Sequence, residues 1–136
     1  MSIQKSEIKL EVSGKSVNAY LASPANGGPG ILVLHAWWGL KPFFKQVCDQ
    51  LAEHGFVAFA PDLYQGRVAH TIDEAKAFQA EFEQSDPEHL GAAVKAAQNY
   101  LSDLYAGKPT GVMGFSMGAA WSMIVAANEP NVSTVV

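Results

Sequence analysis

The chain has 136 residues, nearly half of them apolar, a composition that predicts one folded domain with a buried core. Its net charge is −4 and Arg67 is its only arginine, so no basic surface for nucleic acid is expected. The one cysteine, Cys48, rules out an internal disulfide and fits a reducing compartment. Residues 1–12 lack the apolar run of a signal peptide and no run is long enough to cross a bilayer. We therefore expect a soluble cytoplasmic protein without a membrane partner.

The first half of the chain predicts an antiparallel hairpin followed by buried strands. Polar and apolar residues alternate over Ser6–Ser13 and again over Ser16–Ala22, with a Ser-Gly-Lys turn between them. Three later segments, Ile31–His35, Phe56–Ala60 and Gly111–Phe115, are continuously apolar, which is typical of strands covered on both faces.

Helical periodicity fills the spaces between these strands. Helices are predicted over Lys41–His54, Thr71–Gln84, Asp86–Tyr105 and Met117–Asn128. The last is apolar nearly all round and should be buried against the sheet. Ser133–Val136 resembles the opening of a further strand. The alternation of strand and helix predicts a single three-layer α/β domain, with a mainly parallel sheet and the hairpin at its N-terminal side.

The pentapeptide Gly114-Phe115-Ser116-Met117-Gly118 lies between a predicted strand and a predicted helix. A G-x-S-x-G sequence in this position is typical of a nucleophile elbow, where the serine hydroxyl is exposed on a sharp turn. The Met117 N–H would point at the reaction centre from the first turn of the helix. A second N–H, from Trp37, would come from the loop after the first parallel strand. The structural alternative is an ordinary strand-to-helix turn with Ser116 as N-cap.

Three motifs in this order and spacing resemble the dienelactone hydrolase family of α/β-hydrolases. They are HAWWGL (35–40), APDLYQGR (60–67) and GFSMGAA (114–120), and the likeness runs over essentially the whole chain. The resemblance implies that Ser116 is the nucleophile and that the N–H groups of Met117 and Trp37 form the oxyanion hole. It also implies hydrolysis of a small-molecule ester or lactone without a metal or an organic cofactor.

Two departures from the family bear on the substrate. Founding members carry a cysteine where this chain has Ser116, and a glutamate where it has Ala36. A glutamate that controls the protonation of a thiol is not needed beside a serine, which a histidine base can activate alone. A simple ester or lactone is therefore a better prediction than dienelactone. Trp38 is a candidate wall of the substrate pocket, with core packing as the alternative. Arg67 is a candidate contact for a substrate carboxylate, with a solvated loop position as the alternative.

The catalytic partners of the serine are missing from this chain. In α/β-hydrolases an acid and then a histidine follow the nucleophile, yet no histidine or aspartate follows Ser116. Glu129 would lie roughly 18 Å away at the far end of the helix. Relative to the family, the C-terminal third or more is absent, so we expect a C-terminally incomplete fold. The 136-residue chain alone should be nearly inactive.

Upstream histidines do not replace the missing base. His35 is predicted to shape the oxyanion loop, His54 to sit at a helix C-terminus and His89 to face solvent. His70 follows the second parallel strand at the same edge of the sheet and stays a secondary candidate. Cys48 lies on an apolar helix stripe and is predicted as a core residue.

A different class of function is a non-catalytic assembly module. An unfinished sheet would expose an open edge near Ser133–Val136, which could pair with another chain or with a second copy. A second polypeptide could then supply the missing strands, acid and histidine.

Two further expectations complete the sequence analysis. Asp62, in the APDLY turn, is predicted to bond backbone groups. A nucleotide-binding domain is disfavoured because no glycine-rich phosphate motif follows a strand.

Overall fold

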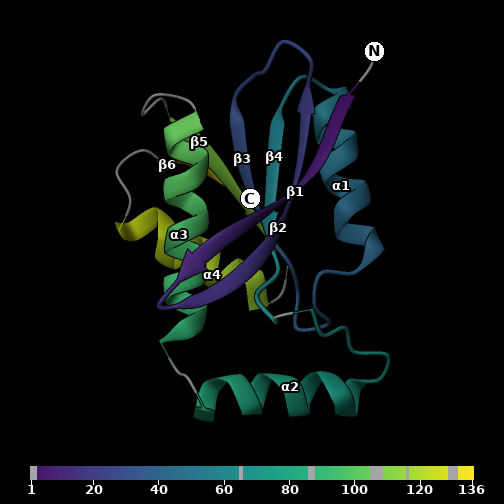
Figure 1. Cartoon of the computed structure of the whole chain (residues 1–136), viewed down its shortest axis with the longest axis vertical. Helices are drawn as coiled ribbons and strands as arrows, with labels where there is room; N and C mark the ends of the chain where they lie inside the picture. Colours follow the sequence, from purple (N-terminus) through teal and green to yellow (C-terminus); the bar gives the residue numbers. More distant parts are fainter. Residues whose placement is uncertain (1–2, 65, 86–87, 105–108, 116, 129–131) are drawn as a thin grey trace.

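The described residues form one mixed sheet with helices on both faces (Figure 1). The computed structural model describes residues 3–64, 66–85, 88–104, 109–115, 117–128 and 132–136. The strands are β1 (Ile3–Val12), β2 (Lys15–Pro24), β3 (Gly30–Leu34), β4 (Val57–Pro61), β5 (Thr110–Gly114) and β6 (Val132–Val135). The helices are α1 (Pro42–Glu53), α2 (Ile72–Ser85), α3 (His89–Leu104) and α4 (Met117–Asn128). None of the described helices is long and apolar enough to span a bilayer.

The strand order is β1-β2-β4-β3-β5-β6, and it confirms the predicted sheet with an antiparallel hairpin at its N-terminal side. β1 and β2 pair antiparallel, and both strands extend beyond their predicted limits. The turn between them places Ser13 and Gly14 at positive φ, 51° and 82°, as a tight hairpin turn requires. β2 is antiparallel to β4, whereas β3 pairs parallel with β4 and β5, and β5 pairs parallel with β6.

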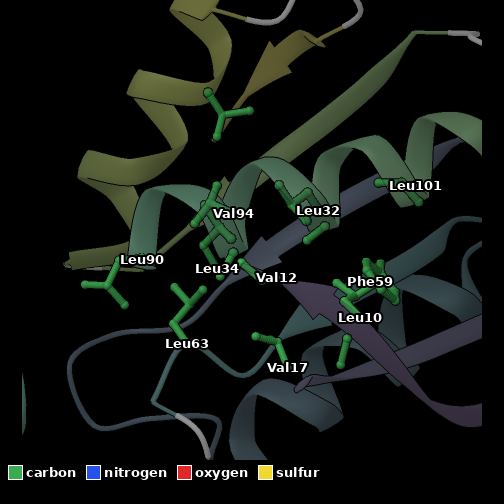
Figure 2. Close-up of a cluster of buried hydrophobic side chains, with 14 of the residues drawn as sticks. Leu10, Val12, Val17, Leu32, Leu34, Phe59, Leu63, Leu90, Val94 and Leu101 are labelled. Atoms are coloured by element: carbon green, nitrogen blue, oxygen red, sulfur yellow. The ribbon is translucent and has the colours of Figure 1, made fainter. Parts of the chain in front are cut away.

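Alternation along the central strands divides the core into two layers. Leu32 and Leu34 face α3, while Val33 faces α1. Figure 2 shows the larger cluster, in which Phe59 lies among leucines and valines from the sheet and from α3. Burying alternate apolar side chains on opposite faces is what gives these strands their continuous apolar sequence.

The helix α4 is less buried than its composition predicts. Val125 is 6% exposed and packs in the core, but Met123 is 68% exposed and Ile124 is 48% exposed. The prediction that this helix is buried against the sheet is confirmed for the side that carries Val125, whereas the opposite side is exposed. The physical reason is its position at the end of the layer, where it packs on β3, β5, β6 and α3 and leaves its outer face uncovered.

The helix α2 lies across one end of the molecule, away from the sheet (Figure 1). Thr71 caps its start, because the Glu74 N–H donates to Thr71 Oγ1 at 3.1 Å. Phe78 joins the helix to the loop after β4 through an edge contact with Tyr64, whose ring centroid is 6.3 Å away.

Candidate active site

The predicted elbow and the predicted oxyanion loop leave the sheet side by side. β3 and β5 are parallel neighbours, with Leu34 opposite Gly114. Just beyond this pair, the Phe115 N–H donates to the Leu34 carbonyl at 3.1 Å. Ser116 itself lies outside the described residues, and α4 begins immediately after it at Met117. The two segments that carry the predicted oxyanion donors thus start from one edge of the sheet.

Backbone contacts hold the loop after β3 in a defined shape. A turn is closed by the Gly39 N–H, which donates to the Ala36 carbonyl at 3.2 Å. The Ala69 N–H donates to the Trp38 carbonyl at 2.9 Å and ties this loop to the segment before α2. Among the described residues, no acceptor is found for the Trp37 N–H.

His35 is fully buried beneath this loop and both of its ring nitrogens are occupied. The Leu63 N–H donates to Nε2 at 3.0 Å, so that nitrogen must carry a lone pair. The proton therefore resides on Nδ1, which donates to the Ala36 carbonyl at 2.6 Å. Burial lowers the pKa of His35 below its usual value, partly opposed by this bond and by the Asp62 charge. The structure confirms a loop-shaping role and rules out His35 as the base.

The buried neutral imidazole makes stability depend on pH. As pH falls below about 6.5, the ordinary histidine pKa, the unfolded chain gains a proton at His35 that the folded chain does not. Stability contributed by the neutral ring is complete above that pH and is lost below it, by at most about 1.4 kcal/mol per pH unit. Urea unfolding at pH 7.5 and 5.5 should show this loss, and the His35→Gln variant should show a smaller one. Equal losses in the two proteins would contradict the assignment.

Asp62 holds the loop after β4 through backbone bonds, as the sequence predicts. Its two carboxylate oxygens accept the N–H groups of Tyr64 and Gly66 at 3.1 and 2.9 Å. Both carboxylate oxygens of Asp62 thus stabilise the backbone of this loop.

The two candidate substrate contacts lie within these loops, Trp38 after β3 and Arg67 after β4. Arg67 forms an ion pair with Glu81 on α2, and its guanidinium lies 5.4 Å from the centre of the Phe78 ring. Trp38 is half-buried, with the Lys41 ammonium 4.8 Å from its ring centre. The roles of both residues toward substrate stay predictions.

The remaining nucleophile and base candidates have other positions. Cys48 is completely buried, and burial raises the pKa of its thiol to about 12, so it does not form a thiolate. His54 bonds the Gln50 carbonyl through Nδ1 at 2.8 Å, and His70 is exposed. The prediction for His89 is wrong, since it is 2% exposed. It lies four residues before Ala93, on the stripe of α3 that faces the core.

The structure adds an aromatic group that sequence reasoning missed. Phe115, directly before the predicted nucleophile, packs edge-on against Phe43 and Phe44 at the start of α1, with ring centroids 6.0 and 5.3 Å away. Phe43 is 55% exposed beside the elbow. The adjacent phenylalanines after Pro42 could have indicated an aromatic cluster. Helical periodicity, however, places only Phe44 on the buried face of α1 and gives no partner for Phe43.

A family model described as "Dienelactone hydrolase family" matches residues 17–136. The chain belongs to this family. It is 37% identical to "Protein usf" of Aquifex pyrophilus over 129 residues, which are 91% of this chain and 56% of that protein. It is 35% identical over 128 residues to a protein of Aquifex aeolicus named "Putative carboxymethylenebutenolidase", covering 90% of this chain and 55% of that one.

A similar solved structure is that of a cold-adapted esterase from an Arctic intertidal metagenomic library. It superposes with a TM-score of 0.74 and 28% identity, over 99% of this chain and 60% of that one. The predicted family and α/β fold are thereby confirmed. This dienelactone hydrolase family chain spans little more than half the length of the curated relatives that it matches.

Proposed function

We propose that this chain carries the nucleophile and oxyanion hole of a serine hydrolase acting on small esters or lactones. Ser116 Oγ would attack the carbonyl carbon, and the N–H groups of Met117 and Trp37 would stabilise the oxyanion. Collapse of the tetrahedral intermediate would expel the alcohol, and water would then release the acid from the acyl-enzyme. One observation carries the proposal. The loop that holds Trp37 and the turn that leads to Met117 follow the C-terminal ends of two neighbouring parallel strands, β3 and β5.

The substrate class follows from the residues beside the nucleophile and from the relatives. One relative is named a carboxymethylenebutenolidase and a structural neighbour is named an esterase. Ala36 stands at the position of the founding members' glutamate, the partly exposed Phe43 contacts Phe115 beside the elbow, and Trp38 is half-buried in the loop after β3. An uncharged, partly apolar ester or lactone is compatible with such surroundings.

The chain alone should turn over substrate very slowly, because it lacks a base for Ser116. Among the described upstream histidines, His35 and His54 are held by backbone bonds, and His70 stays a secondary candidate. Loss of a triad base costs about 10⁶-fold in turnover, which leaves the contribution of the oxyanion hole and binding.

A thiol at position 116 tests the proposed site without needing the base. The Ser116→Cys variant should be acylated by p-nitrophenyl acetate about 10²-fold faster than a free thiolate of the same pKa, because N–H donors would stabilise the oxyanion. Release of one equivalent of p-nitrophenol measures it. Cys48 is the internal control, since its buried thiol should stay unmodified. Acylation no faster than that of the free thiolate would favour the ordinary N-cap turn.

A second candidate function is an assembly module, favoured by the uncovered end of the sheet. The edge strand β1 carries alternating lysines and glutamates, whereas the opposite edge strand β6 has no charge. A groove of about 270 Å³ crosses β3, β5 and β6 and is lined by apolar side chains such as Ile31 and Met113. The helix α1 packs mainly on β1, β2 and β4, and among the strands of the groove it meets β3 at Val33.

Self-association through β6 is expected if the edge is used in this way. Sedimentation velocity should then show a dimer at micromolar concentration, and Val135→Lys should convert it to a monomer by charging the edge. Met123→Lys is the matched control, because it places the same charge on the exposed face of α4 and leaves the edge unchanged. A monomer at all concentrations would count against pairing with a second copy.

A further inference from the structure

One peptide group joins His35 to the proposed oxyanion hole. The Ala36 carbonyl accepts two hydrogen bonds, from His35 Nδ1 at 2.6 Å and from the Gly39 N–H at 3.2 Å. This carbonyl belongs to the same peptide unit as the Trp37 N–H. Because a trans peptide is planar, its C=O and N–H point in opposite directions. Holding the oxygen toward the protein interior therefore aims the N–H away from it.

The protein around His35 admits only one form of the ring. The Leu63 N–H at Nε2 requires a lone pair there, which leaves Nδ1 as the donor. The ring is sealed by Tyr64 and Phe44, with ring centroids 5.3 and 6.2 Å away, and Asp62 is the charged group near it. A second proton would place two donors face to face at Leu63. The imidazole is thus locked as a donor toward Ala36.

We propose that His35 is a positioning residue that orients the Trp37 N–H toward the oxyanion. The inference rests on the proposed function, because it assigns a task within that site. The two ring nitrogens have different roles. Nδ1 fixes the direction of the peptide that carries the donor, and Nε2 fastens the loop after β3 to the loop after β4. A residue that only packed the core would need neither bond.

Two substitutions separate these tasks because each keeps one of the bonds. His35→Asn keeps an amide donor at the position of Nδ1 and loses the acceptor for Leu63. His35→Gln places an amide oxygen near the position of Nε2 and loses the short-range donor to Ala36. Each should be made in the chain and in the Ser116→Cys chain. Measurements are the melting temperature, the NMR order parameter of the Trp37 N–H and the rate of thiol acylation.

The expected result is that orientation and stability respond to different variants. His35→Asn should lower the melting temperature by roughly 3–10 °C and keep the Trp37 order parameter near the rigid value of about 0.85. His35→Gln should melt closer to the unmodified chain, yet its order parameter should fall below about 0.7 and its acylation rate about tenfold. The proposal would be overturned if both variants had the same Trp37 order parameter and the same acylation rate. It would also be overturned if these two quantities changed only in proportion to the melting temperature.

A measurement on the unmodified ring covers the case in which neither variant folds. Long-range ¹H–¹⁵N correlation should show a neutral His35 with its proton on Nδ1, and a proton on Nε2 or a charged ring at pH 7 would overturn the proposal. Failure of the function itself looks different. The Ser116→Cys chain would then show no acceleration with His35 intact, while the Trp37 order parameter would still respond to His35→Gln.

Discussion

Joining this chain to the C-terminal part of a longer relative is expected to raise ester hydrolysis by about 10⁴- to 10⁶-fold. The segment that follows the matched region of the Aquifex pyrophilus relative suits this design, provided that it supplies an acid and then a histidine. The gain should come from deprotonation of Ser116 by the added histidine, because the oxyanion donors are proposed to be present already. Hydrolysis of p-nitrophenyl butyrate and of a simple lactone measures it.

The control for this completed chain is the same fusion with Ser116→Ala, which should return to the rate of the 136-residue chain. A folded fusion that stays inactive on every ester and lactone would contradict the proposed reaction class. A fusion whose activity survives Ser116→Ala would place the nucleophile elsewhere.

Replacing Gly39 with alanine is expected to lower the free energy of unfolding by about 3 kcal/mol. A Cβ at this position would lie 2.4 Å from the Arg67 carbonyl oxygen, and the backbone has a φ of +92°. The positive φ costs a side chain roughly 1–2 kcal/mol, and the forced separation of two backbones costs roughly 1–3 kcal/mol more. Because the same loop holds Trp37, thiol acylation of the Ser116→Cys chain should also fall, by about tenfold. Urea unfolding gives the stability change.

Gly55 provides the matched control, because its φ is +95° and an added Cβ would meet nothing within 4 Å. Gly55→Ala should cost only the conformational part, about 1 kcal/mol, and leave acylation unchanged. If Gly39→Ala and Gly55→Ala lowered the free energy of unfolding equally, the contact between the loop after β3 and the Arg67 segment would contribute nothing to stability.

The parts of the fold that the sequence predicts are those with a strong local pattern. Continuous apolar runs predict β3, β4 and β5, and helical periodicity predicts α4 at Met117–Asn128. The exposed face of α4 was not predictable, because composition reports that a helix is apolar and not which neighbours are there to cover it. The polarity of His89 predicts exposure, whereas its place four residues before the core residue Ala93 puts it on the buried stripe of α3.

In the candidate site, the sequence predicts which residues meet at one edge of the sheet but not how they are held. The bond from Leu63 to His35 joins residues 28 positions apart, and the approach of Gly39 to Arg67 is equally non-local. Such contacts depend on how two loops dock, and no periodicity within either loop encodes it. The aromatic contact of Phe43 with Phe115 has the same origin.

The most direct test of the central claim is to locate a fluorophosphonate adduct by mass spectrometry. The completed chain should take up one equivalent within minutes, entirely at Ser116, while the 136-residue chain should react at the same residue far more slowly. An adduct at another residue of the completed chain would contradict Ser116 as the nucleophile. Rapid, stoichiometric labelling of the 136-residue chain would contradict the claim that its serine lacks a base.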